Sequence, residues 1–343
     1  MSYFFQSSGF DFPSKGRNIT IGGWKELGRT SLGVGDDNIT VSSLANKRYL
    51  MVLQHSIQSG VIGNLWRVNS DTGTNYAIRL SENGGADATA TSAAAAGQGV
   101  TASANDTFAT MYLSNSTPNE KLGISHFIGR NTIGATNAPA KSEGAFKWAN
   151  SVDAVSAITG YNDQAGSFAA GSEVVVLGWD GADSHTTNFW EELASVNASG
   201  SSTNLSSGTI TAKKYLWVQA WLKNTTSHTT ALTFNNDTTT YAYRLSDNGG
   251  ADATSTSQAN ISVYSAVTTP IFVNMFIINV SANEKLVIGH TVSQSTAGAA
   301  TITDRREFVG KWDETASQIT EIDLDSSSGN WDSASIIKVW GSD

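Results

Sequence analysis

The chain has 343 residues with a net charge of −9 at pH 7, and none of them is cysteine. An acidic chain disfavours nucleic acid as a partner, because binding to phosphates requires cations that displace counterions, and it equally disfavours an anionic membrane surface. The lack of cysteine excludes disulfide scaffolds, thiolate metal sites and cysteine nucleophiles. We therefore expect packing alone to stabilise the fold.

Residues 1–21 form an aromatic segment without helix or strand periodicity. Five aromatic residues fall within its first twelve positions: Tyr3, Phe4, Phe5, Phe10 and Phe12. Exposed aromatic side chains are common anchors at interfaces, so these are the candidate partner-docking residues. The segment packs on its own first module or docks on a neighbouring subunit. It lacks the basic and apolar regions of a signal peptide, so we expect the protein to be made in a cytoplasm.

The rest of the chain is a tandem duplication. Residues 76–92, YAIRLSENGGADATATS, return as residues 241–257, YAYRLSDNGGADATSTS, with 14 of 17 positions identical. A gapless match of this length does not arise by chance. We assign residues 22–180 to a first module, 181–189 to a linker and 190–343 to a second module.

The first module predicts a series of short strands and no helix. Alternating or continuous apolar patterns place strands at residues 38–41, 47–53, 65–68, 76–80, 107–113, 121–128, 144–148, 155–161 and 173–179. Asn83–Gly85 and Asn115–Asn119 supply turns, and residues 86–105 predict a long loop with one short strand. Short strands at regular spacing indicate sandwiches, so the fold class is all-β, with two tandem jelly-roll-like β-sandwich modules.

The second module repeats these elements in order. Trp24 corresponds to Trp190 and Trp148 to Trp312, so the spacing between equivalent residues drifts from 166 to 164. The second module ends in the same pattern as the first, since Gly178 corresponds to Gly341. Small insertions and deletions therefore separate two copies of one fold.

Two equivalent histidines, His126 and His290, are the first candidates for chemistry. His126 lies on one strand face with Leu122, Ile124 and Ile128. A histidine in an apolar register is usually a core or interface residue, and no second histidine or carboxylate pair accompanies it. We interpret both histidines as structural.

Two sets of charged pairs recur in both modules. Glu120–Lys121 with Glu284–Lys285 predict solvated or bridging charge pairs, and Glu143–Lys147 with Glu307–Lys311 predict ion pairs at the surface. Glycoside hydrolysis would require two carboxylates facing each other across a groove, and the sequence singles out no such pair. We assign no catalytic residue and expect no enzymatic activity.

Two polar stretches are better explained as turns than as ligand sites. Residues 69–75, NSDTGTN, resemble a calcium loop, but the second copy loses the glycine, which favours a hairpin turn. In NGGADAT, Gly84 and Gly249 are expected at positive φ. Arg79 with Asp87 is expected to form a local charged cluster, as is Arg244 with Asp252. Nucleotide-binding loops and serine nucleophile elbows are absent, so we expect no cofactor and no metal.

The combined pattern YAxRxSxNGGADAT…NEKLxIxH…GKW resembles a β-module of virion structural proteins from tailed viruses of aquatic microbes. The likeness covers nearly all of residues 22–343. The first module carries the pattern at Asn69, Asp71, Thr72, Gly73, Asn75, Tyr76, Arg79, Asn83, Gly84, Gly85, His126 and Trp148. The second module departs from it, with DTTT at residues 237–240 and Ser342 in place of Trp179.

The resemblance implies a structural role on a virion, as a head decoration, head fibre or tail component attached through residues 1–21. It implies other virion proteins as partners, a homo-oligomer or symmetric assembly, and location on a virion assembled in the host cytoplasm. One alternative is a double jelly-roll major capsid protein. Another is a pair of carbohydrate-binding or adhesin modules that binds a host-surface glycan through exposed tryptophans. We expect no nucleic acid and no membrane as partners.

Overall fold

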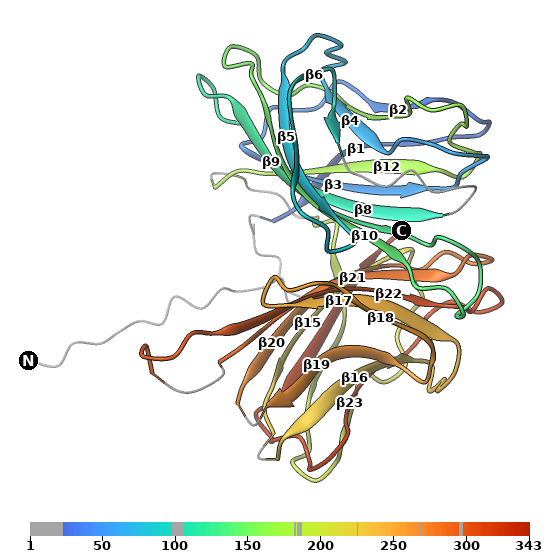
Figure 1. Cartoon of the computed structure of the whole chain (residues 1–343), viewed down its shortest axis with the longest axis vertical. Helices are drawn as coiled ribbons and strands as arrows, with labels where there is room; N and C mark the ends of the chain where they lie inside the picture. The colour runs from blue at the N-terminus through green and yellow to red at the C-terminus, as the bar shows by residue number, and fades with distance from the viewer. Residues whose placement is uncertain are drawn as a thin grey trace, which may run out of the picture.

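The computed structural model describes residues 23–97, 106–181, 183, 187–224, 226–267, 269–294 and 298–343. Within these residues all regular structure is β, as predicted, and it comprises 24 strands. No helix long and apolar enough to cross a membrane occurs in this part of the chain. The strands form two β-sandwich modules that follow each other along the chain (Figure 1).

The first module pairs an eight-stranded sheet with a four-stranded sheet. In spatial order the large sheet contains β1 (Lys25–Ser31), β12 (Glu173–Trp179), β3 (Tyr49–Ser56), β8 (Thr107–Ser114), β9 (Lys121–Gly129), β10 (Ala140–Trp148), β5 (Tyr76–Glu82) and β6 (Ala88–Ala93). The small sheet contains β2 (Asn38–Val41), β11 (Ile158–Tyr161), β4 (Leu65–Val68) and β7 (Ala96–Gly97). All strand pairs in this module are antiparallel.

The second module has the same two sheets with the same strand order. Its large sheet contains β13 (Glu191–Asn197), β24 (Ile336–Ser342), β15 (Tyr215–Leu222), β20 (Ile271–Ile278), β21 (Lys285–Ser293), β22 (Asp304–Trp312), β17 (Tyr241–Asp247) and β18 (Ala253–Gln258). Its small sheet contains β14 (Asn204–Ser206), β23 (Ile322–Ser326), β16 (His228–Phe234) and β19 (Ile261–Val267). Each strand therefore has a counterpart in the first module.

The strands around residues 86–105 differ from the prediction. That stretch forms the edge strand β6 and the short strand β7, where one strand was expected, and residues 98–105 lie outside the described residues. The alanine and threonine composition hides these strands because they carry no apolar alternation. All six residues of β6 are exposed or half-buried.

Each sandwich has its own core between its large and small sheets. Side chains alternate along a strand, so in β3 Leu50 and Val52 point into this core while Met51 and Leu53 point away from it. The tryptophan that ends β10 is buried and donates its indole N–H to Asp71 at 2.6 Å. Trp312 donates in the same way to Asp237 at 2.8 Å. The two cores are thus built alike.

A third apolar cluster joins the two modules. It combines outward-facing side chains of both large sheets: Met51, Leu53, Phe108, Ile128, Val175, Leu177, Phe189, Trp190, Tyr215, Phe276, Ile278, Leu286, Ile288, Val309 and Trp340. The large sheets therefore pack on each other through the faces that point away from their own cores (Figure 1). Burying both faces is the source of the continuous apolar runs seen in β12 and β20.

The repeated NGGAD turns have the predicted backbone conformation. Gly84 has a φ of 71° and Gly249 a φ of 73°. The charged clusters also form, with 3.0 Å between Arg79 and Asp87 and 3.7 Å between Arg244 and Asp252. The second cluster spans the modules, because Lys141 of the first module approaches Asp252 to 3.1 Å. The two turns therefore meet at the module interface, where a Cβ at Gly84 would lie 2.6 Å from Asp252.

Candidate functional site

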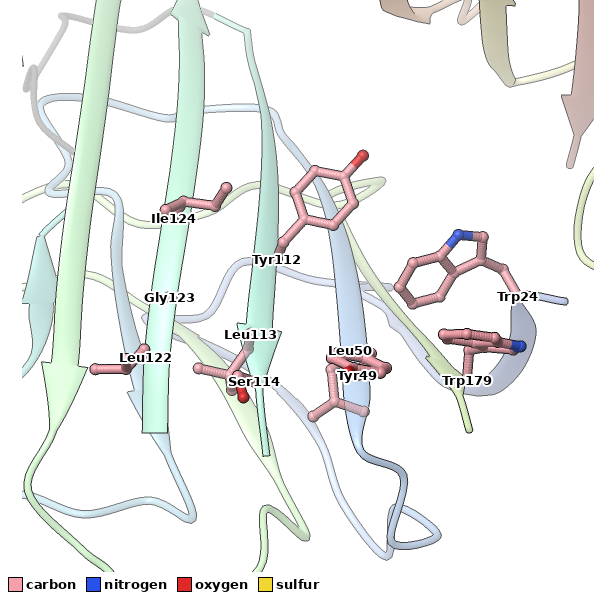
Figure 2. Close-up of a pocket in the computed structure, with 10 residues that line it drawn as sticks. All are labelled: Trp24, Tyr49, Leu50, Tyr112, Leu113, Ser114, Leu122, Gly123, Ile124 and Trp179. Atoms are coloured by element: carbon pink, nitrogen blue, oxygen red, sulfur yellow. The ribbon is translucent and has the colours of Figure 1, made fainter. Parts of the chain in front are cut away.

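One hollow on the described surface is an aromatic depression of about 410 Å³ on the large sheet of the first module. We call it the aromatic hollow. Its lining residues come from β3, β8, β9, β12 and the segment before β1: Trp24, Tyr49, Leu50, Tyr112, Leu113, Ser114, Leu122, Gly123, Ile124 and Trp179. Figure 2 shows the aromatic side chains gathered along one face of the sheet. Tyr49 stacks on Trp179 with ring centroids 5.5 Å apart, and Trp24 lies 6.3 Å from Tyr112.

The hollow exists because the outer face of this sheet stays apolar beyond the module interface. Tyr49, Leu122 and Ile124 lie on the same face as the interface residues but toward the other end of their strands. They are 41%, 59% and 53% exposed. Contiguous exposed apolar surface of this kind marks an interaction site more often than a solvent face.

The same surface of the second module is covered. The counterparts of Tyr49, Leu122 and Ile124 are Tyr215, Leu286 and Ile288, which are 0%, 0% and 2% exposed. Part of the cover comes from the first module, since Phe108 lies 6.3 Å from Tyr215 between ring centroids. Phe189 and Trp190 of the segment before β13 also contribute, through ring contacts with Tyr215 and Phe276. Equivalent residues therefore form an interface in one module and an open hollow in the other.

Hydrogen bonds between the two modules lie at the edge of the covered surface. Glu173 of the first module accepts hydrogen bonds from the Tyr215 hydroxyl at 2.7 Å and from Lys214 at 2.9 Å. Burial acts to raise the pKa of Glu173, but the hydrogen bonds from Ser31 and Lys214 outweigh it and hold the pKa below its usual value. The carboxylate is thus an ionised acceptor that joins the two modules.

A buried cluster of charged residues from both modules forms a second polar part of this interface. It contains Asp106 and Arg130 of the first module and Asn283, Glu284 and Lys311 of the second. Arg130 approaches Asp106 to 3.1 Å and Glu284 to 3.7 Å, and Lys311 approaches Glu284 to 3.5 Å. Asn283 donates to Asp106 at 2.6 Å. Each of these charges has a partner of opposite sign, as buried charges require.

Burial dominates the ionisation of this cluster. It raises the pKa of Glu284 to about 7 and lowers the pKa of Lys311. The backbone N–H of Gly134 donates to Glu284 at 2.6 Å, and Lys311 donates to the carbonyl of Thr132 at 2.6 Å. Shifted pKa values often mark catalytic groups. In this cluster, however, Glu284 and Lys311, whose pKa values are shifted, are held by contacts between the modules.

The prediction that Glu120–Lys121 and Glu284–Lys285 are solvated pairs is wrong in three of four positions. Lys121, Glu284 and Lys285 are buried. Each lysine folds back onto two carbonyl oxygens, those of Asn119 and Asn150 for Lys121 and those of Asn283 and Glu314 for Lys285. A charged residue at a strand start looks exposed in sequence, but here the preceding turn and the loop after the neighbouring strand, β10 or β22, supply carbonyl groups to the lysine.

The predicted Glu143–Lys147 and Glu307–Lys311 pairs are also wrong. Lys147 pairs with Glu120 of the neighbouring strand at 2.9 Å, and Lys311 pairs with the equivalent Glu284. Residues four apart along a strand share a face, yet a residue of the adjacent strand is closer in an antiparallel sheet. Glu143 instead approaches Lys141 to 3.7 Å, and Glu307 pairs with Arg305.

The histidines lie in the module interface. Their rings touch edge to face with centroids 4.3 Å apart. Burial lowers the pKa of His126 to about 3, with further lowering from His290, and burial also lowers the pKa of His290. Both are neutral packing residues at neutral pH, which agrees with the structural interpretation.

Residues 69–75 form a closed turn. Asp71 accepts hydrogen bonds from the Gly73 backbone N–H at 2.8 Å, from Asn75 at 2.9 Å and from the Trp148 indole at 2.6 Å. The carboxylate oxygens are therefore committed to protein donors. Among the described residues, no group of three or more His, Asp or Glu side chains has the geometry to hold a metal ion.

The sequence-predicted docking residues Tyr3, Phe4, Phe5, Phe10 and Phe12 lie outside the described residues. The aromatic hollow itself was not predicted. A signal for it was present, because Leu122 and Ile124 alternate with small residues, and Trp179 ends a strand. The two outward-facing residues recur in the second module as Leu286 and Ile288, so they could not reveal which copy stays open.

Comparison with known proteins includes one distant structural likeness. No protein-family model matches the chain, and no curated protein matches it. Among solved structures, domains LG4–5 of the mouse laminin α1 chain are similar over 93% of this chain and 91% of that chain, with 9% identity and a TM-score of 0.18. At that TM-score the likeness supports no inference about a site or an activity.

Proposed function

We propose that the protein is a non-enzymatic structural component of a virion, displayed on the head or tail and attached through residues 1–21. The observation that carries the proposal is the placement of three sets of buried ionisable groups. Glu173, the Arg130–Glu284 cluster and the two histidines all lie between the modules and hold them together. The aromatic hollow is lined mainly by apolar and aromatic side chains and suits docking rather than catalysis.

The sequence resemblance to virion proteins agrees with this architecture. A particle component needs a stable body and a separate attachment point. The two sandwiches supply the body, because their large sheets share one apolar cluster and buried polar contacts. The aromatic segment supplies the attachment point, with other virion proteins as partners and a symmetric assembly as the context.

The proposal is tested by incorporation of the full chain into virus particles. In the test variant, Tyr3, Phe4, Phe5, Phe10 and Phe12 are replaced by serine. Control substitutions at three other exposed apolar residues, Val34→Ser, Val152→Ser and Ile302→Ser, remove surface hydrophobicity elsewhere. We expect the control to be incorporated at the wild-type level and the test variant to be lost from purified particles. Equal incorporation of both would refute attachment through the segment.

A carbohydrate-binding function is the second candidate, and the aromatic hollow favours it. Sugar rings stack on exposed aromatic faces, and Tyr49 and Trp179 provide such faces. Sugars also need hydrogen-bond partners, whereas Ser114 is the only non-aromatic polar side chain that lines this hollow. Glycan binding that is lost in Trp179→Ala would support this candidate over the first.

The double jelly-roll capsid alternative remains a separate proposal. It requires the protein to form the shell rather than to decorate it. Electron microscopy of particles distinguishes the two, because a shell protein is present in hundreds of copies at shell-forming positions.

A further inference from the structure

The surface of the second module that corresponds to the aromatic hollow is covered by described residues. Two aromatic rings from the segment before β13 pack on that surface of the second module. Phe189 lies 6.2 Å from Tyr215, and Trp190 lies 6.1 Å from Phe276 and 5.8 Å from Trp217 between ring centroids. Both covering residues are almost fully buried. The chain that leads into the first strand of a module thus serves as a cover for its outer face.

The first module has one of these two aromatic contacts. Trp24, the counterpart of Trp190, lies over Tyr112, the counterpart of Phe276, at 6.3 Å. The two leading segments run side by side, since the Phe189 backbone N–H donates to the Trp24 carbonyl at 2.9 Å. In the described part of the chain, however, Gly23 precedes Trp24, so nothing there takes the place of Phe189.

The residues that precede Gly23 have the composition that the hollow requires. Tyr3, Phe5, Phe10 and Phe12 fall at two-residue spacing within their pairs, so each pair lies on one face of an extended segment. From Gly23 back to Phe12 there are eleven further residues, which span at most roughly 36 Å when extended. A tether of this length keeps the aromatic residues at high effective concentration near the hollow.

We propose that, in the free protein, the aromatic side chains of residues 3–12 occupy the aromatic hollow of the same chain. They bury Leu122, Ile124 and Tyr49, which are otherwise the most exposed apolar residues of that face. The segment then covers the first module as Phe189 and Trp190 cover the second. This inference concerns the chain alone and stands whether or not the protein belongs to a virion. If it does, the attachment segment is stored on the protein's own surface before assembly.

The test uses the fact that the chain contains no cysteine. In the full chain, Ser8→Cys and Ser114→Cys place one thiol in the segment and one in the hollow. We expect mild oxidation to give an intrachain disulfide, seen as a monomer of altered mobility on a non-reducing gel. A matched variant with the same two cysteines and with Phe10→Ser and Phe12→Ser keeps the tether but removes two anchors. Its cross-linking should be about tenfold slower, because aromatic packing is lost.

Each other outcome overturns the proposal. Equal rates with and without the phenylalanines show that the tether alone brings the thiols together. Disulfide-linked dimers at low protein concentration show that the segment docks on a second copy. No cross-link, while the single variant Ser114→Cys melts at the wild-type temperature and its thiol reacts freely, shows that the hollow is open. None of these results depends on incorporation into particles, so a failure here is distinguishable from a failure of the proposed function.

Discussion

His126 and His290 occupy the same position in the two modules and touch edge to face, with ring centroids 4.3 Å apart. Contact between equivalent residues is typical of an interface related by an approximate two-fold axis. The equivalent outer surfaces of the two modules are nevertheless not equally covered. Tyr215 is buried against the first module, whereas Tyr49, its counterpart, is 41% exposed. The duplication therefore produced one covered and one open copy of the same surface.

The histidine contact makes the module interface sensitive to acid. Burial lowers the pKa of His126 in the folded state to about 3, below the value near 6.5 of the unfolded chain. This stabilisation is fully present above pH 6.5 and is lost as the pH falls below that value. For His126 the loss at pH 5 is about 2 kcal/mol. Chemical unfolding at pH 7.5 and pH 5 should show a smaller difference for His126→Gln than for the wild type; equal differences would contradict this role.

Glu284 has the opposite pH dependence. Burial raises its folded-state pKa to about 7 from 4.5, so its contribution is present below pH 4.5 and is lost as the pH rises through 7. The variant Glu284→Gln keeps an acceptor for the Gly134 N–H and removes the titration. We expect it to gain stability at pH 8 relative to pH 4.5 by at most about 3 kcal/mol compared with the wild type.

The control for Glu284→Gln is Glu120→Gln, at the equivalent position of the first module. Glu120 pairs with Lys147 on the surface, where the side chains are 42% and 45% exposed. The control should change stability by less than about 0.5 kcal/mol at either pH. A pH effect of equal size in both variants would show that burial between the modules is not its cause.

The two NGGAD turns offer a matched pair of glycine substitutions. Gly84→Ala and Gly249→Ala both place a side chain at positive φ, which costs about 1 kcal/mol each. A Cβ at Gly84 would also lie 2.6 Å from the backbone nitrogen of Asp252, whereas at Gly249 the nearest atom is the end of the Arg305 side chain at 3.2 Å. Thermal unfolding should show that Gly84→Ala has a lower free energy of unfolding than Gly249→Ala, by about 1–3 kcal/mol. Equal losses would indicate that the turns do not meet.

The tyrosine pair tests the polar edge of the interface. Tyr215→Phe removes the hydroxyl that donates to Glu173 at 2.7 Å and leaves part of a buried carboxylate without its donor. We expect a loss of about 1–3 kcal/mol in the free energy of unfolding. Tyr49→Phe alters the equivalent, half-exposed residue and should cost less than about 0.5 kcal/mol. The account is contradicted if the two variants unfold at the same denaturant concentration.

The sequence predicts the all-β class and the duplication because both follow from local patterns. Alternation identifies strands such as β9, and the repeated YAxRLS and NGGADAT segments identify equivalent turns. The packing of one module on the other does not follow from such patterns. Leu122 and Leu286 are the same residue in the same context, yet one is 59% exposed and the other is buried. The Glu120–Lys147 and Glu284–Lys311 pairs differ in the same way.

The most direct test of the account is hydroxyl-radical footprinting of the full-length protein, which measures the solvent exposure of individual side chains. It should compare the wild type with the variant in which Tyr3, Phe4, Phe5, Phe10 and Phe12 are serine. Leu286 and Ile288, which are buried in the second module, provide the internal reference. We predict that Leu122 and Ile124 react slowly in the wild type, like the reference residues, and several-fold faster in the serine variant. Fast oxidation of Leu122 and Ile124 in both proteins would contradict the account.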